Sequence, residues 1–196
     1  MNNETTNEAK KSEMIQQAEN LLKMAGLDSD TIAELEFWGY FRAPASKGHH
    51  LAVPGGLVQH SINVTTRLVA LTKALRLKWP RPESPYLVGM LHDVVKVRTY
   101  RVDDTIARTE GEPPKYKYVP SVYGGHGAAS VMMITSELQK SLYPEEALAI
   151  RWHMGAFGLA GDELKEYDAA LDAFPDLLIA THTADMLASR VDEREV

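Results

Sequence analysis

The sequence contains no cysteine, no apolar run that could cross a membrane and no excess of positive charge. The absence of cysteine excludes a disulfide scaffold and a thiolate metal site. A membrane span needs about 20 apolar residues, and the polar start Met1–Thr6 is unlike a signal peptide, so we expect a cytoplasmic protein without a membrane partner. The formal net charge of −6 argues against a surface built for long nucleic acid, because neutralising phosphates drives much of that affinity.

What the chain does contain suits one globular domain. Its 196 residues, 44% of them hydrophobic, are enough for a single domain with a proper core. We expect a flexible N-terminal tail at 1–12, one domain at 13–190 and a charged C-terminal tail at 191–196. The sequence has neither the Gly-rich loop of nucleotide-driven motors nor the Gly-x-Ser-x-Gly turn of α/β-hydrolases. The chain therefore lacks the usual sequence signature of both enzyme classes.

Helical spacing dominates the apolar pattern. Apolar residues within 57–75 share one helix face with His60, and the segment from about 85 to 97 is apolar on nearly every side, which predicts a central helix. Further helices are expected to begin near Gly124, Pro144 and Pro175. Residues 157–167 are expected to form a loop. The fold class predicted from this pattern is all-α, with about seven or eight helices.

The exception is the stretch 98–125, where apolar and polar residues alternate over short runs separated by Gly and Pro. This pattern predicts a small β-hairpin or an irregular flap. Its arginine, lysine and tyrosine side chains could close over an anionic substrate, because Arg suits phosphate and Tyr stacks on bases. A solvated excursion fits the same composition equally well.

His92 and Asp93 stand in an otherwise apolar segment, 86–95. Burying an unpaired imidazole and an unpaired carboxylate costs several kcal/mol, so each needs a partner, and one metal ion would satisfy both. Further ligand candidates lie on or at the ends of predicted helices: His60, His126, His153 and Asp185. Imidazole and carboxylate ligands without thiolate suit Mn, Fe, Co, Ni, Zn or Mg. An inward His60 taken alone is more often a hydrogen-bonded core histidine.

The order of these residues resembles the HD-domain metal-dependent phosphohydrolase superfamily. Shorter stretches carry the same resemblance: Pro44–His50, Gly55–Leu57 before His60, Gly125–Gly127 and Ala184-Asp185. They are similar to stand-alone bacterial and prophage HD hydrolases and to the catalytic domain of HD-type 3′→5′ exoribonucleases. The resemblance extends from about Phe41 to Arg190 and implies an HD-domain helical bundle around the metal ligands.

The resemblance also implies a dinuclear site and a phosphohydrolase activity. In this reading one divalent ion is held by His60, His92, Asp93 and Asp185, and Asp93 bridges to a second ion held by His126 and His153. A metal-bound hydroxide would then attack the phosphorus of a nucleotide or a short oligonucleotide. Asp93 and Lys96 are the expected catalytic residues, with the Lys96 ammonium neutralising phosphate charge in the transition state. A lysine that reaches solvent from a helix end is the alternative for Lys96.

The expected substrate contacts lie on two segments. Lys47 and His50 belong to a loop that runs along the active-site mouth in the similar proteins, although composition alone would leave them solvated. Arg98 and Tyr100 begin the flap. His182, one turn before Asp185, is expected to orient a ligand through a hydrogen bond, with plain packing as the alternative.

Three functions are compatible with these residues. Hydrolysis of a small nucleotide-type phosphate ester ranks first, because the chain is acidic and lacks the separate OB-type domain that HD-type exoribonucleases carry. A 3′→5′ exonuclease-like phosphodiesterase acting on RNA or single-stranded DNA ranks second. A non-catalytic metal- or nucleotide-binding module ranks third, because the complete ligand set with Lys96 favours an enzyme. The metal, the bond cleaved and the oligomeric state stay open.

Overall fold

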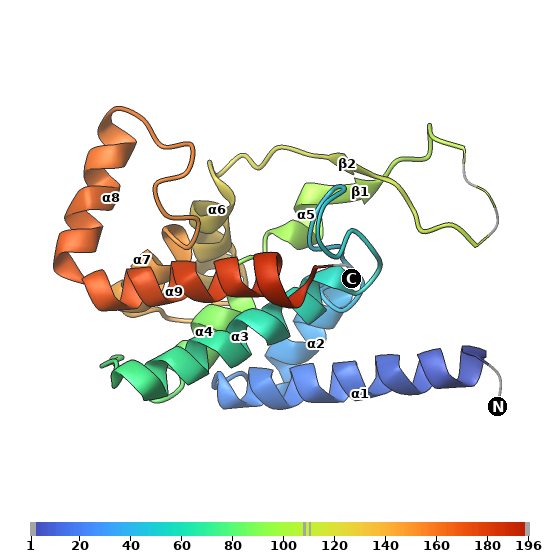
Figure 1. Ribbon diagram of the computed structural model, residues 1–196, viewed down its shortest axis with the longest axis horizontal. Coiled ribbons are helices and arrows are strands. Elements are labelled where there is room, and N and C mark those ends of the chain that lie inside the picture. The colour runs from blue at the N-terminus through green and yellow to red at the C-terminus, as the bar shows by residue number, and fades with distance from the viewer. Residues whose placement is uncertain (1–2, 108, 110, 195–196) are drawn as a thin grey trace.

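The computed structural model describes residues 3–107, 109 and 111–194 and is a helical bundle with one small hairpin (Figure 1). In chain order the α-helices are α1 (Asn3–Met24), α2 (Ser29–Trp38), α3 (Gly56–Leu75), α4 (Ser84–Leu91), α5 (Lys96–Thr99), α6 (His126–Met132), α7 (Pro144–Arg151), α8 (Asp162–Ala173) and α9 (Pro175–Leu187). Two π-helical turns, η1 (Met133–Glu137) and η2 (Ala188–Asp192), extend α6 and α9. The predicted all-α class with a small flap is confirmed.

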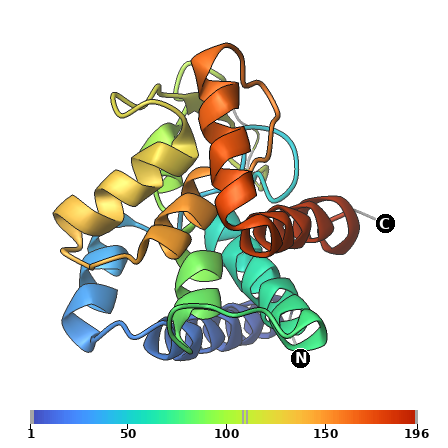
Figure 2. The same ribbon diagram turned by 90° about the vertical axis from the view of Figure 1, so that its left-hand side faces the viewer.

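The core forms where α3 meets its neighbours. α3 packs against α4 on one side and α9 on another, and α4 also contacts α1 and α7. Figure 2 shows these helices grouped around the centre of the bundle. Their inward side chains are fully buried: Leu57, Val64, Leu68, Leu87, Val88 and Leu91. No helix in the described part of the chain is both long and apolar enough to cross a membrane.

The helix predicted over 85–97 is interrupted, which corrects that expectation. α4 ends at Leu91, residues 92–95 form turns, and α5 begins at Lys96. In the interruption the Val94 N–H donates to the Leu91 carbonyl at 3.1 Å and the Lys96 N–H donates to the Asp93 carbonyl at 2.9 Å. Such i→i−3 bonds tighten the backbone to about three residues per turn, so side chains three apart lie one above the other. The Lys96 side chain is thereby brought over Asp93.

The predicted flap is a two-stranded antiparallel hairpin. β1 (Tyr100–Val102) pairs with β2 (Tyr116–Tyr118), with Tyr100 opposite Tyr118. β1 follows α5 directly and contacts it, so the hairpin starts a few residues after Asp93. Figure 1 shows the strands beside α5 at the edge of the bundle.

Two further segments differ from the sequence expectation. The prediction of a loop at 157–167 was wrong from Asp162 onward, where α8 begins. Asp162 and Glu163 lie in its first turn, where the helix dipole favours carboxylates. At the N-terminus, residues 3–12 of the expected flexible tail form the first turns of α1. At the other end, residues 191–192 of the expected tail belong to η2.

Candidate metal centre

The six predicted ligands come from five parts of the chain that the bundle brings together. They lie in the first turns of α3, in the turn after α4, at the start of α6, in the turn after α7 and near the end of α9: His60, His92, Asp93, His126, His153 and Asp185. All except the partly exposed His126 are buried. A set of charged and imidazole groups is therefore held inside the bundle rather than on its surface.

Asp93 lies in the middle of this cluster. Its Oδ2 is 3.4 Å from the Nε2 of His92 and 3.8 Å from the Nε2 of His60. Its Oδ1 faces the other way, 3.5 Å from the Nε2 of His153. Asp185 joins from α9, with its Oδ1 3.2 Å from the Nε2 of His60.

The ligand atoms form two groups that share one carboxylate. His60, His92 and Asp93 offer atoms that all lie within 4.8 Å of one another, and so do Asp93, His126 and His153. The rings of His126 and His153 are 5.9 Å apart. Asp93 thus occupies the position expected of a bridging ligand, and Asp185 adjoins the first group through His60.

The backbone sets the tautomer of two of the histidines. The Nδ1 of His92 lies 2.9 Å from the Gly89 carbonyl oxygen, and the Nδ1 of His153 lies 2.7 Å from that of Ile150. Because a carbonyl oxygen only accepts, each Nδ1 must carry the hydrogen. Each Nε2, which faces Asp93, is then the nitrogen with the free lone pair, as a metal ligand requires.

Two buried atoms of the cluster test whether a metal fits. Among the residues described by the structure, Asp93 Oδ1 and His153 Nε2 are buried without a hydrogen-bond partner. Burial is the main cause that lowers the pKa of His153 to about 4, so its Nε2 faces a carboxylate as a lone pair. Two electron-rich atoms 3.5 Å apart are unfavourable unless a cation lies between them. A divalent ion that prefers nitrogen and oxygen ligands fits this geometry.

Lys96 adds a buried positive charge to the cluster. Its Nζ lies 2.6 Å from Asp93 Oδ2, and both side chains are buried. Burial works to raise the pKa of Asp93, but Lys96 and His92 outweigh it and hold that pKa well below its usual value. Burial opposes the charged form of Lys96 as well, yet Asp93 raises its pKa. The two groups therefore form an ion pair at neutral pH.

His60 lies between two carboxylates, one at each ring nitrogen. Asp185 faces its Nε2, while Glu193 Oε1 lies 2.9 Å from its Nδ1. Burial opposes the charged imidazolium, but hydrogen bonds to Asp185 and Glu193 outweigh burial and raise the pKa of His60 to about 9. A divalent ion bound at Nε2 would take the place of the proton there.

Glu193 is the residue of this site that the sequence did not indicate. It stands in the run Val191–Val196, where charged residues surround it and nothing distinguishes it from its solvated neighbours. Its side chain is only 1% exposed. The signal that identifies it is three-dimensional, because Glu193 follows η2 and its carboxylate lies against His60 of α3 in the folded chain.

Of the four expected substrate contacts, the structure brings two beside the cluster. The His50 ring lies 5.2 Å from the His60 ring. Tyr100 is half-buried, and this burial raises the pKa of its hydroxyl. The charge of the nearby Lys96 acts in the opposite direction. Lys47 is exposed, and its charge acts on Asp103, where it helps to lower the pKa of that carboxyl. His50 belongs to the 46–50 loop and Tyr100 to β1 of the hairpin.

Arg98 is held elsewhere. Its two terminal nitrogens donate to the Glu137 carboxylate at 2.7 and 2.6 Å, and its guanidinium lies 5.2 Å from the centre of the Trp38 ring. This paired arrangement leaves the guanidinium committed to α2 and η1 rather than directed at the metal ligands.

His182 contacts the backbone of a ligand. Its Nδ1 lies 2.8 Å from the carbonyl oxygen of His153 and donates to it. Through this bond α9 holds the turn that carries His153. The hydrogen bond expected of His182 is therefore made to the chain that bears the ligand, not to an imidazole or carboxylate.

A scan against protein-family models gave no match, and searches of curated proteins and of solved structures found no similar protein. The cluster combines groups of His and Asp side chains that could hold a metal ion, a carboxylate that two of these groups share and one buried ammonium group.

Proposed function

We propose that this protein is a metal-dependent phosphohydrolase of the HD-domain type, acting on the phosphate ester of a nucleotide or a short oligonucleotide. One observation carries the proposal. The Asp93 carboxylate is shared by two groups of histidines, and its Oδ1 and the Nε2 of His153 are buried without a hydrogen-bond partner in the described chain. Paired ligand sites around one carboxylate are typical of enzymes that cleave phosphate esters.

Bound divalent ions would supply Lewis-acid chemistry, lowering the pKa of a water molecule and polarising a phosphoryl oxygen. The chain supplies the rest. Lys96 holds its ammonium beside Asp93, where it offsets the negative charge of the phosphoryl group. His153, with a pKa lowered to about 4, keeps its lone pair throughout the neutral range. The burial of His60 and His92 excludes bulk water from one side.

The hairpin supports a nucleotide as the substrate. The Tyr100 and Tyr118 rings lie 6.3 Å apart on neighbouring strands, and Tyr118 is exposed. Exposed aromatic rings give nucleobases a stacking surface, and Tyr100 places this surface next to Lys96. We expect the base to contact the hairpin while the phosphate faces Lys96.

Product analysis by chromatography tests the proposal. The full-length protein is incubated with added Mn²⁺ and, separately, with deoxynucleotides, ribonucleotides, cyclic nucleotides and a short RNA. We expect phosphate, pyrophosphate or a nucleoside from one nucleotide class, and loss of the product in Asp93→Ala. Because Asp93→Ala also removes the partner of Lys96, His153→Gln serves as a second variant that leaves the ion pair intact.

Each outcome has a meaning. Loss of turnover by about 100-fold or more in both variants, at unchanged circular dichroism, supports catalysis at this centre. Shortening of the RNA without turnover of any mononucleotide would instead establish the exonuclease-like function. Metal-loaded protein that is inert on every substrate would overturn the proposed hydrolase.

A further inference from the structure

The chain segment after α9 returns to α3 and closes one side of the cluster. η2 continues α9, and the Glu193 N–H donates to the Ala188 carbonyl at 3.0 Å. This wider turn directs the Glu193 carboxylate at α3, where its two oxygens lie 2.9 and 3.2 Å from the Nδ1 of His60. A carboxylate that lies so near the end of the described chain is thus buried against a ligand of the proposed metal.

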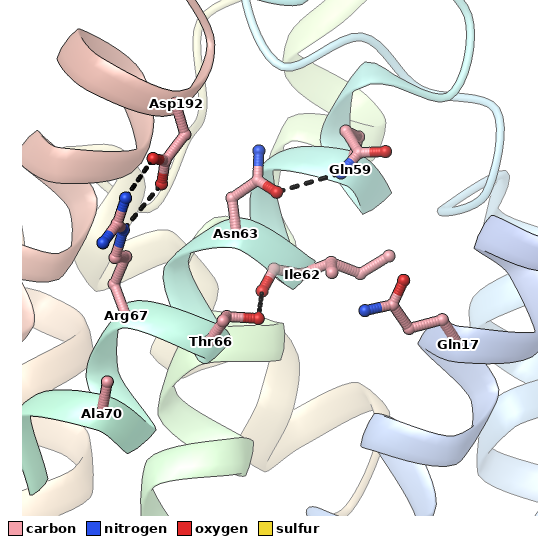
Figure 3. Close-up of a pocket in the computed structure, with 8 residues that line it drawn as sticks. All are labelled: Gln17, Gln59, Ile62, Asn63, Thr66, Arg67, Ala70 and Asp192. Atoms are coloured by element: carbon pink, nitrogen blue, oxygen red, sulfur yellow. Dashed lines mark hydrogen bonds and ion pairs between the residues drawn. The ribbon is translucent and has the colours of Figure 1, made fainter.

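Two consecutive acidic residues, Asp192 and Glu193, hold this turn against α3. Asn63 donates to Glu193 Oε1 at 3.0 Å, and the Nε of Arg67 donates to Asp192 at 2.9 Å while its Nη2 donates to the other oxygen. Asn63 and Arg67 are one helical turn apart, so they face the same direction. Figure 3 shows both reaching from α3, with Asp192 meeting Arg67, along a cavity of about 480 Å³.

We infer that Glu193 is a positioning residue for His60. This inference rests on the proposed metal-dependent function. Glu193 meets the Nδ1 of His60, whereas Asp185 lies at Nε2 on the other side of the ring, where the proposed ion would bind. A carboxylate that accepts from Nδ1 fixes the ring and makes Nε2 a stronger ligand.

His60 differs in this respect from the other buried ligands. His92 and His153 use neutral backbone carbonyls at Nδ1, while His60 meets a full negative charge. The charged partner makes His60 the strongest nitrogen donor of the three. The first metal group therefore depends on Glu193, and the second group, which contains no His60, does not.

A competing role for Glu193 has a distinct signature. His50, His60 and Glu193 also offer atoms within 4.8 Å of one another, so Glu193 could itself be a metal ligand. Against this, its 2.9 Å distance to His60 Nδ1 is that of a direct hydrogen bond. Metal stoichiometry separates the two roles, because a positioning residue changes affinity without changing the number of ions bound.

Titration calorimetry with Mn²⁺ and the absorption spectrum of the Co²⁺ form test the inference on the full chain. We compare the wild type with Glu193→Ala, Glu193→Gln and the matched control Asp192→Asn. We expect Glu193→Ala to weaken the first ion by about 10- to 100-fold and to shift the Co²⁺ bands. Glu193→Gln keeps an acceptor oxygen and should lose less affinity. Asp192→Asn keeps a side-chain oxygen that can accept from Arg67, so the turn should stay on α3 and this variant should bind Mn²⁺ nearly as the wild type does.

The inference and the proposed function fail in different ways. Wild type that binds Mn²⁺ and turns over substrate, with unchanged affinity in Glu193→Ala, overturns the inference alone. An equal loss in Asp192→Asn would show that the fold of η2 matters, not the Glu193 carboxylate, and overturns it too. Loss of one whole ion in Glu193→Ala would make Glu193 a ligand. Wild type that binds no divalent metal overturns the inference together with the proposed function.

Discussion

Asp93 uses its two oxygens for different purposes. Oδ1 faces His153, while Oδ2 faces His60, His92 and the Lys96 ammonium. The Lys96 pair is buried, so removing one partner leaves the other charge without compensation in a medium that solvates it poorly. Asp93 should therefore contribute to stability as well as to metal binding.

We predict that Asp93→Asn lowers the free energy of unfolding of the metal-free protein by about 3–5 kcal/mol. Lys96→Met added to Asp93→Asn should recover part of that loss, because it removes the unpaired charge. Urea denaturation with a chelator present measures both. If the free energy of unfolding of Asp93→Asn lay within about 1 kcal/mol of the wild-type value, the prediction would be contradicted, because an exposed ion pair contributes about that much.

The sequence indicates a functional role only where the neighbours of a polar residue restrict its possible environments. His92 and Asp93 could be assigned to a site because apolar neighbours make their burial costly without a partner. Glu193 could not, since a carboxylate in a charged run looks the same whether it is solvated or buried. Arg98 was expected at the substrate, but Glu137, remote in sequence, binds it. Pairing between distant residues is a property of the fold.

At the level of elements, the crossing of α6 and α7 brings the second metal group together. A Cβ added to Gly127 would lie 2.2 Å from the Arg151 carbonyl oxygen and 2.8 Å from that of Ile150, so only glycine allows this approach. His126 precedes Gly127 and His153 follows Arg151 closely. The backbone contact therefore sets the distance between two proposed ligands.

We predict that Gly127→Ala pushes α6 from α7, lowers the free energy of unfolding by about 1–3 kcal/mol and weakens the second bound ion more than the first. Gly125→Ala is the matched control, because no described atom beyond Gly125 and its two chain neighbours lies within 4 Å of the Cβ it would add. Thermal melting and Mn²⁺ titration measure the two effects. Equal behaviour of the two variants would contradict the close-contact explanation.

Elements with a strong apolar face were predictable, whereas local tightening was not. α3, α7 and α9 carry such faces or a Pro at the start, and α7 and α9 begin at the predicted residues Pro144 and Pro175. The interruption at 92–95 escaped prediction because the apolar pattern continues through Val94 and Val95. Its i→i−3 bonds accompany the contact between Asp93 and Lys96. A sequence pattern with about 3.6 residues per turn does not reveal such a local tightening.

Across the whole molecule, metal binding and folding should be linked. The proposed ligands come from five separate segments, so an unfolded chain does not hold them near one another. An ion that binds only the folded state stabilises it by about 2.7 kcal/mol at a concentration 100 times its Kd. Stability then becomes a measure of site occupancy.

We predict that saturating Mn²⁺ raises the Tm by about 5–10 °C, since about 1 kcal/mol corresponds to roughly 2–4 °C in a domain of this size. A chelator should reverse the increase. Scanning calorimetry of the wild type and of His92→Gln measures it, and the variant should gain much less. An identical gain in both proteins would show that the ion binds elsewhere.

The contact between His60 and Glu193 joins residues that are 133 positions apart. Contacts of such sequence separation require a long loop to close and form late, after the local helices. Interactions absent from the folding transition state act mainly on the rate of unfolding. A bound ion at His60 should therefore extend the lifetime of the native state while the refolding rate stays nearly unchanged.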